Sequence, residues 1–401
     1  MKHLYGIFLF CALLISCASD TDIAIIDLHK EYPAIDLQLS DMADVSYIPL
    51  KGKDSAVFKT GRLEYDNAIY IDSNYIFIAD SNPVEYDSGS KTTYVLSDAA
   101  HLYMFDSDGN FIRTVVNPGK EENQFFGFGM NYTVHPAAET ITVHGTTQNT
   151  VKVFDFNGNY KGTYNLGKRY YANTAFNDTV LFVDYTSQFI RNDGSVKDNG
   201  KTLMYYNINT KSHFNGQDIF MSPLSARPGY TTQNKIVRTN SGAFLVTPRT
   251  DTIYHISNNL NVTPKFVTIW QDAESDHCII PIAETGEYIL FSTDIDYSSE
   301  QKGTLSYKTY LLNKKDNQFY RINTPGGNSD AFEKSIFSNE LLLGSCNTTQ
   351  TPNTLAYMLP IKYLKENHNS LPDKLKQITA SAKEDDNPVL MIVKFREQIS
   401  F

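Results

Sequence analysis

The stretch His101–Val115 reads HLYMFDSDGNFIRTV, and its pattern returns downstream at Thr150–Tyr164 as TVKVFDFNGNYKGTY. In both, two runs of alternating apolar and polar residues flank a turn that carries Asp, Gly and Asn. This pattern predicts a β-hairpin, because the turn residues tolerate positive φ and the alternation gives each strand one buried face. A hairpin that recurs after about 50 residues favours a β-propeller, whose blades are four-stranded sheets.

Weaker copies of the pair Phe105-Asp106 follow at similar intervals, which gives six in all: Phe154-Asp155, Tyr206-Asn207, Ile256-Ser257, Leu312-Asn313 and Leu359-Pro360. A second candidate hairpin precedes each copy, at residues 68–80, 132–144, 174–185, 236–248, 279–293 and 333–345. Two hairpins make one four-stranded blade. The sequence therefore predicts an all-β fold, a six-bladed β-propeller of antiparallel blades.

Two further strands are expected outside the repeats, at residues 44–51 and 388–396. Because a propeller is closed by completing one blade, we expect these N- and C-terminal strands to close the ring. Helical spacing after the sixth repeat predicts a short helix near the C-terminus that covers the last blade, through Leu371, Leu375, Ile378 and Ala382.

The N-terminus begins with Lys2 and His3, followed by the short apolar run Leu4–Ile15. Such a start predicts a secretion signal, which is removed from the mature protein. The end of this run, Leu14-Ile15-Ser16-Cys17, resembles the lipobox of bacterial lipoproteins, and the resemblance implies lipidation of Cys17. The alternative is an ordinary signal in which this cysteine is incidental. We assign residues 1–16 to the signal peptide, 17–43 to a tether and N-terminal segment, and 44–401 to one propeller domain.

The formal net charge is −10, from 35 basic and 45 acidic residues. This balance argues against nucleic acid as a partner, because phosphate binding depends on clustered Lys and Arg. We expect a monomeric propeller that meets the membrane through its lipid anchor. For Cys278 and Cys346, the sequence favours two buried thiols over a disulfide, since neighbouring blades need not bring the two Cα atoms within bonding range.

Together these features resemble the six-bladed β-propeller lipoproteins of Gram-negative gut anaerobes, which are akin to NHL-repeat propellers. The resemblance includes the early Tyr47-Ile48-Pro49-Leu50, the Phe-Asp-x-x-Gly-Asn hairpins and the late Asp386-Asn387-Pro388-Val389-Leu390. This sequence departs from the family pattern at residues 119–125, GKEENQF, which lack the inner glycines of the usual turn. The family implies the fold and a location in the outer membrane, at the cell surface or on the periplasmic side, more than an activity.

The two faces of such a ring differ in their connections. Links between first and second strands and between third and fourth strands share one face and are short, whereas the remaining links share the other face and are long. Binding residues concentrate on loops held by a rigid frame. We therefore predict a binding face for a glycan or a partner protein on the long loops, at Arg169, Tyr170, Tyr171, Arg227, Tyr230 and Trp270.

Catalytic motifs are weak in this sequence. Asp106–Asn110 imitates the start of a calcium loop, and His135 and His144 flank one hairpin, but neither set completes a metal site. We predict no catalytic residue, no metal and no cofactor. The alternative function is a secreted polysaccharide lyase or glycoside hydrolase with a carboxylate and His site at the central channel, for which Asp294 and Asp296 are candidates.

Overall fold

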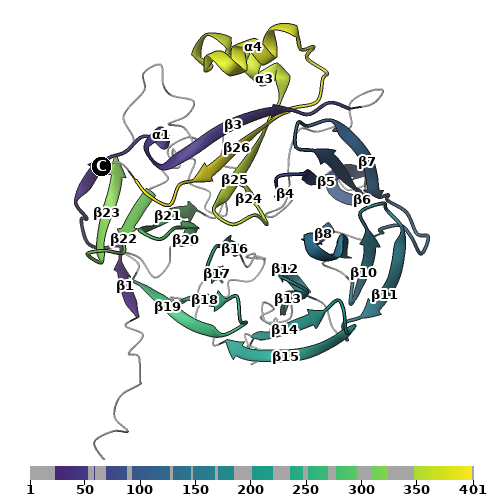
Figure 1. Cartoon of the computed structure of the whole chain (residues 1–401), viewed down its shortest axis with the longest axis horizontal. Coiled ribbons are helices and arrows are strands. Elements are labelled where there is room, and N and C mark those ends of the chain that lie inside the picture. The colour runs from purple at the N-terminus through teal and green to yellow at the C-terminus, as the bar shows by residue number, and fades with distance from the viewer. Residues whose placement is uncertain are drawn as a thin grey trace, which may run out of the picture.

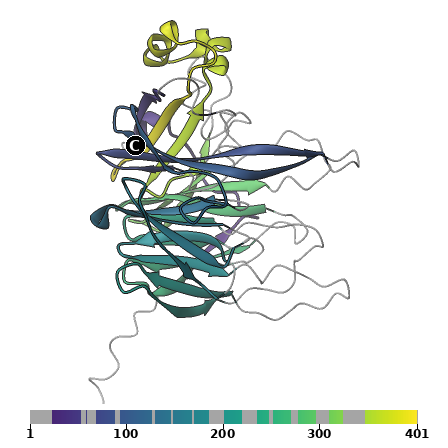
Figure 2. The ribbon, with the colours of Figure 1, turned by 90° about the vertical axis from the view of Figure 1, so that its right-hand side faces the viewer.

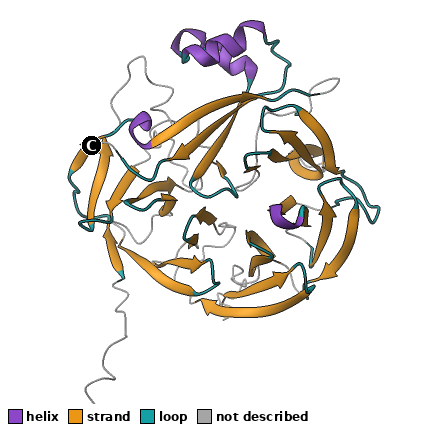
Figure 3. Cartoon of the chain, in the orientation of Figure 1, coloured by secondary structure: helices purple, strands orange, loops and turns teal. Residues whose placement is uncertain are grey.

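The computed structural model contains six β-sheets arranged as blades around a central axis (Figure 1). It describes residues 23–52, 58, 69–87, 93–126, 130–145, 148–167, 170–184, 201–219, 235–246, 252–269, 277–295, 309–323 and 347–399. Strands dominate this part of the chain, and helices are few and short (Figure 3). The prediction of an all-β, six-bladed propeller is confirmed.

Each blade has four antiparallel strands that run in order from the axis outward. Blade one is β4 (Ile69–Ile71), β5 (Tyr75–Asp87), β6 (Thr93–Asp106) and β7 (Phe111–Val116). Blade two is β8 (Met130–His135), β9 (Thr140–Gly145), β10 (Thr150–Asp155) and β11 (Tyr160–Asn165). Blade three is β12 (Tyr170–Phe176), β13 (Thr179–Asp184), β14 (Lys201–Asn207) and β15 (Ser212–Ile219).

The second half of the ring follows the same plan. Blade four is β16 (Lys235–Thr239), β17 (Gly242–Val246), β18 (Thr252–Ser257) and β19 (Val262–Ile269). Blade five is β20 (His277–Glu284), β21 (Tyr288–Ile295), β22 (Thr309–Asn313) and β23 (Gln318–Asn323). Blade six is β24 (Asn347–Thr348), β25 (Thr354–Leu359), β26 (Val389–Phe395) and, outermost, β3 (Ala43–Pro49) from the N-terminal part of the chain.

Ring closure joins the two ends of the chain, as the sequence predicts. Strand β3 pairs with β26 along its whole length, from Pro49 opposite Val389 to Ala43 opposite Phe395. Near this closure, Arg396 binds Asp44 through Nε and Nη2 at 2.9 and 2.7 Å. Both nitrogens donate to the same oxygen, Asp44 Oδ1, and these charge-assisted bonds join the end of β26 to the start of β3.

The segment before β3 adds strands to two more blades, which the sequence did not predict. Strand β1 (Ala24–Asp27) pairs in parallel with β19 of blade four, and β2 (Ala34–Asp36) pairs in parallel with β23 of blade five. The short helix α1 (Leu39–Met42) then leads into β3. Residues 24–49 therefore pass along the outer edges of three consecutive blades.

The prediction for blade six needs correction. Leu359-Pro360 was expected to end its third strand, but β25 is the second strand and β26 is the third. Two helices, α3 (Ile361–Glu366) and α4 (Asp373–Ser381), lie between β25 and β26. The proposed first hairpin at 333–345 lies outside the described residues.

Helix α4 covers blade six from outside, as expected, with Leu375 in the core, while Leu371, which is also in the core, precedes the helix. None of the helices in the described ranges is long and apolar enough to cross a membrane.

The core consists of apolar clusters between neighbouring blades. Phe77 of blade one packs with Tyr132 of blade two, and Val180 of blade three packs with Val151 of blade two. The largest cluster joins blades four, five and six with the N-terminal strands and the two helices. Facing sheet surfaces bury their apolar side chains against each other, which holds the blades in a rigid ring.

The Asp-x-x-Gly-Asn turns are built by their own side chains. Asp106 Oδ1 accepts hydrogen bonds from the backbone N–H of Asp108 (3.0 Å) and Asn110 (2.8 Å), while Asn110 Nδ2 donates to Asp106 Oδ2 at 2.8 Å. In blade two, Asp155 repeats the two bonds to Asn, from the backbone N–H and Nδ2 of Asn159. The carboxylate that imitates a calcium ligand in the sequence therefore serves the turn itself.

Candidate functional site

Residues 349–353, the turn between β24 and β25, extend to the centre of the ring (Figure 1), and we call them the axial turn. The side chain of Gln350 reaches blade two, where its Oε1 accepts from the N–H of Val134 (3.2 Å) and its Nε2 donates to the carbonyl of Tyr132 (2.8 Å). The amide thus takes the place of a strand partner at the open inner edge of β8. Gln350 also donates its own N–H to the carbonyl of Ile69 on β4 at 3.0 Å.

Asn353 makes the same kind of contact with blade five. Its Oδ1 accepts from the N–H of Glu284 at 2.9 Å, and its Nδ2 donates to the carbonyl of Glu284 at 2.5 Å. Its backbone N–H donates to the carbonyl of Arg238 on β16 at 3.3 Å. Asn353 has a φ of 52°, a conformation that Asn tolerates better than most residues.

Thr351 completes the contacts of the axial turn. Its hydroxyl accepts from the N–H of Ile71 at 3.0 Å and donates to the carbonyl of the same residue at 2.5 Å. The axial turn therefore bonds to the inner strands of blades one, two, four and five. All these contacts lie near the ends of strands that lead into short turns, so the axial turn covers the axis on the short-turn side.

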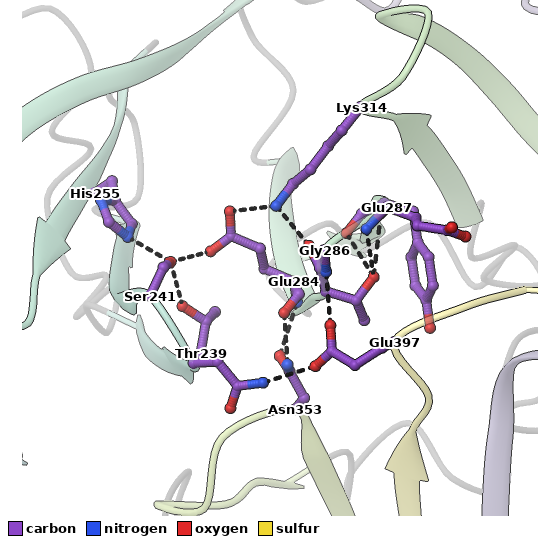
Figure 4. Close-up of polar contacts among 12 residues, drawn as sticks. Thr239, Ser241, His255, Glu284, Gly286, Glu287, Lys314, Asn353 and Glu397 are labelled. Carbon is purple, nitrogen blue, oxygen red and sulfur yellow. Dashed lines mark hydrogen bonds and ion pairs between the residues drawn. The ribbon is translucent and has the colours of Figure 1, made fainter.

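Next to the axial turn lies a polar group that we call the Glu284 cluster: Thr239, Ser241, His255, Glu284 and Lys314 (Figure 4). Lys314 Nζ lies 2.9 Å from Glu284 Oε1, and the side chain of Glu284 is only 10% exposed. Ser241 Oγ donates to Glu284 Oε2 and lies 3.0 Å from His255 Nε2. The cluster thus joins strand ends of blades four and five.

Electrostatics fix the protonation of this cluster. Burial opposes ionisation of Glu284, but Lys314 and Ser241 outweigh it and lower the pKa of the carboxyl below its ordinary value. Burial lowers the pKa of His255, against the attraction of Glu284. Glu284 is therefore a carboxylate at neutral pH, and it forms an ion pair with Lys314.

The direction of the hydrogen bonds excludes a serine nucleophile in this cluster. A nucleophilic serine donates its proton to a histidine. Here the Ser241 hydroxyl donates to Glu284, so that His255 Nε2 donates to Ser241 Oγ. The carboxylate is already bound to Lys314 and Ser241, which leaves it poorly placed to accept a substrate proton. The cluster is arranged to stabilise the junction of two blades.

A second carboxylate ties the C-terminal segment to the same junction. Glu397, which follows β26, accepts from the N–H of Gly286 at 2.7 Å and from Asn240 Nδ2 at 2.9 Å (Figure 4). These partners come from the short turns of blades five and four. The short-turn face between blades four, five and six is thus built of polar groups that satisfy one another.

The histidines singled out in the sequence are both buried. His135 Nδ1 lies 2.9 Å from the carbonyl of Asn177, and His144 Nε2 lies 3.3 Å from the carbonyl of Tyr170. Each ring therefore donates to blade three and is held as a neutral group by burial. Within the described ranges, no three His, Cys, Asp or Glu side chains come together as a metal site would require.

Of the predicted binding residues, Tyr170 is the one whose side chain the structure describes. Its ring is 1% exposed and packs against Phe182, with centroids 5.5 Å apart, in the core between blades two and three. Tyr171 follows it in β12. Arg169, Arg227, Tyr230 and Trp270 lie outside the described residues, as do Cys17, Cys346 and Asp296. Cys278 is in β20 and Asp294 in β21, where they are backbone partners.

Sequence reasoning missed the axial turn and the Glu284 cluster. The turn reads Thr-Gln-Thr-Pro-Asn, which is typical of any surface turn. Ser241, Glu284 and Lys314 each sit in or beside a short turn and carry no motif that distinguishes them from other polar turn residues. Only the ring places them together.

A family model described as "Domain of unknown function (DUF4934)" matches residues 89–394. Among solved structures, a Bacteroides fragilis protein described as exported is similar over 93% of this chain and 100% of its own, with 15% identity and a TM-score of 0.61. A member of the DUF4221 family from Bacteroides vulgatus is similar over 89% of this chain and 97% of its own, with 10% identity and a TM-score of 0.48. No curated protein matches the sequence. The likeness to the Bacteroides fragilis protein indicates a shared fold.

Proposed function

As the chain belongs to this DUF4934 family, which carries no assigned activity, we propose from its own geometry that it is a non-catalytic, extracytoplasmic propeller. In this proposal a lipid on Cys17 anchors the chain in the outer membrane, and the long-loop face binds an extracellular ligand, a glycan or a partner protein. The observation that carries the proposal is the difference between the two faces of the ring.

The long-loop face carries a projecting element. Strands β5 and β6 have 13 and 14 residues, whereas the other strands of blade one have three and six. Their pairing continues to Asp87 opposite Thr93, far beyond the part that β4 and β7 cover. Figure 2 shows this hairpin extending past the blades on one side of the ring. A ribbon held by a rigid frame is a suitable contact surface for a ligand.

The opposite face is occupied by the protein's own groups. The axial turn covers the axis there, and the Glu284 cluster and Glu397 are bonded to neighbouring blades. A ligand would have to displace these bonds in order to bind. The long-loop face is therefore the side that we assign to recognition.

Binding is tested with the full-length protein in detergent on a glycan array and against surface proteins of the host cell. We expect Tyr171→Ala, Tyr230→Ala or Trp270→Ala to weaken a saturable interaction at least about tenfold, since truncation of an aromatic hot-spot residue costs about 2 kcal/mol or more. Phe214→Ala is the matched control, because that ring is 49% exposed on the outer strand of blade three. Unchanged binding in all three variants would rule out this face.

The anchor is tested by membrane fractionation. We expect Cys17→Ala to release the protein from the membrane fraction, because it removes the acylation site, and two or more acyl chains are enough to attach a protein stably without a spanning helix. Cys278→Ala is the control and should remain in the membrane. Turnover of a polysaccharide that a single carboxylate-to-amide change abolishes would contradict the non-catalytic function.

A further inference from the structure

Arg238 lies at the inner edge of the ring, between blades three and four. It belongs to β16, the innermost strand of blade four, and its guanidinium Cζ lies 4.5 Å from the centroid of the Phe176 ring. Phe176 ends β12, the innermost strand of blade three. The charged group is thus partly buried beside the axis, with an aromatic ring over it.

This guanidinium has no counter-ion in the part of the chain that the structure describes. Its Nη1 atom is buried and makes no hydrogen bond. Arg396 differs, since it binds Asp44 and the carbonyls of Ser40 and Ala43. The chain has 45 acidic residues, and none of those described is placed to pair with Arg238.

An isolated buried charge destabilises a fold, and an apolar side chain of similar shape is favoured at such a position. Burial lowers the pKa of Arg238 to about 10, so the group remains a cation at neutral pH. A cation in this position needs an anion that balances its charge. Phe176 lies against the guanidinium and Nη1 is closed to solvent, so the edge formed by Nε and Nη2 is the part left for a planar, bidentate partner.

We propose that Arg238 is the anion-binding residue of an axial site that takes the carboxylate of a small organic acid, of the class of a uronic acid sugar. One guanidinium matches one carboxylate in charge and in fork geometry. Asn353 of the axial turn bonds to the carbonyl of Arg238, so the short-turn side is covered and the acid enters from the long-loop side. The site rests on the proposed function for this direction of entry and for the choice of a sugar acid among carboxylates.

The test is a thermal melt of the full-length protein with sodium glucuronate, with glucose, and with sodium chloride at matched ionic strength. We expect glucuronate to raise the midpoint saturably, and glucose and chloride to leave it unchanged. Arg238→Met should melt at a higher temperature than wild type without ligand and should lose the response to glucuronate. Arg321→Met, at an exposed site on β23, is the control and should respond as wild type does.

Calorimetry adds a direct measure of binding. Glucuronate should bind Arg238→Met and Arg238→Lys at least roughly tenfold more weakly than wild type, because neither offers a bidentate fork. Equal effects of glucuronate and sodium chloride would overturn the site. So would an Arg238→Met variant that melts below wild type, since the guanidinium would then be structural. A response to glucuronate that survives loss of Tyr230 and Trp270 supports the axial site, and the binding assay with those same variants decides the aromatic face separately.

Discussion

Two buried histidines make the stability of this fold depend on pH. His144 lies in β9 with its ring edge against Phe182, at a centroid distance of 5.1 Å, and it bonds to the backbone of blade three. Burial lowers the pKa of His144 to about 4 and lowers the pKa of His135 as well. Both are therefore neutral in the folded protein at pH values where an exposed histidine is charged.

This burial predicts a loss of stability in mild acid. Below pH 6.5 the unfolded chain takes up a proton at position 144 that the folded chain does not, so the free energy of unfolding falls until about pH 4. The loss from His144 should reach about 3 kcal/mol at pH 4. Urea denaturation at pH 7, 5.5 and 4 measures it.

His144→Gln keeps a donor for the Tyr170 carbonyl but does not titrate, so the stability of this variant should fall less than that of wild type as the pH is lowered from 7 to 4. His29→Gln, at an exposed position, is the control and should follow wild type. A parallel decline of the His144→Gln variant and wild type would contradict the assignment.

The turn glycines give a second prediction for single residues. Gly109 has a φ of +79°, and a Cβ there would lie 2.5 Å from the Pro49 carbonyl oxygen and 2.7 Å from Ile48 Cγ2. Gly109→Ala should therefore cost about 3 kcal/mol or more, because it adds a clash with the closing strand to the cost of a left-handed alanine. Chemical denaturation measures the difference.

Two other glycines serve as a graded comparison. At Gly158 the nearest atom to a Cβ would be 3.1 Å away, and at Gly167, which also has positive φ, nothing lies within 4 Å. Gly167→Ala should cost only about 1 kcal/mol, for conformation alone. An equal cost at all three positions would mean that β3 is not packed against the blade-one turn.

At the scale of elements, the axial turn links several blades although it has only five residues. Inner strands of a propeller have one edge without a neighbouring strand, and the backbone groups at such an edge need partners. Gln350, Thr351 and Asn353 supply these partners to three blades through their side chains. A five-residue turn thereby links sheets that share no strand.

Removing one of these side chains tests the link. Asn353→Gly keeps the positive φ but leaves the N–H and carbonyl of Glu284 without partners, so we expect a loss of about 2–4 kcal/mol in the free energy of unfolding. Asn317→Gly is the matched control, since Asn317 has a φ of 55° and is exposed. A loss in Asn353→Gly no larger than in the control would show that the axial turn is not a structural link.

At the scale of the whole molecule, the N-terminal segment determines where the chain enters the ring. Strand β1 runs parallel to β19, from Ala24 opposite Phe266 to Asp27 opposite Ile269. Strand β19 begins just after a short turn, closed by the Leu260 N–H bond to Ser257. The chain therefore reaches β1 from the short-turn side. It also covers the outer edges of blades four and five, which would otherwise invite pairing with other chains.

If Cys17 carries the lipid, this direction predicts the orientation on the membrane. The six residues between Cys17 and Ala24 reach at most about 20 Å, which keeps the short-turn side near the bilayer and the long-loop side away from it. Dyes placed at Lys315→Cys and Asp87→Cys, in a background without other reactive cysteines, test this by energy transfer to labelled lipid. Transfer should be stronger from position 315, and the reverse order would contradict the orientation.

The sequence predicted the repeating part of this fold and the closing pair of terminal strands, and it missed the other parts that depend on distant contacts. Alternation and the Asp-x-x-Gly-Asn turn are local, so β6 with β7 and β10 with β11 could be found. In blade six, α3 and α4 separate β25 from β26, and the repeat spacing that identified the other blades is lost. Gln350 meets Val134 across 216 residues, a pairing that no local pattern indicates.

The last blade is completed by a strand made at the beginning of synthesis. Arg396 and Asp44, which bond across that junction, are 352 residues apart. At roughly 5–20 residues per second, a ribosome takes on the order of half a minute to supply the second partner. Throughout that interval β3 cannot pair with β26, so the ring of the nascent chain stays open. If residues 1–16 are a secretion signal, such a delay suits a chain that passes through a translocation pore before it folds.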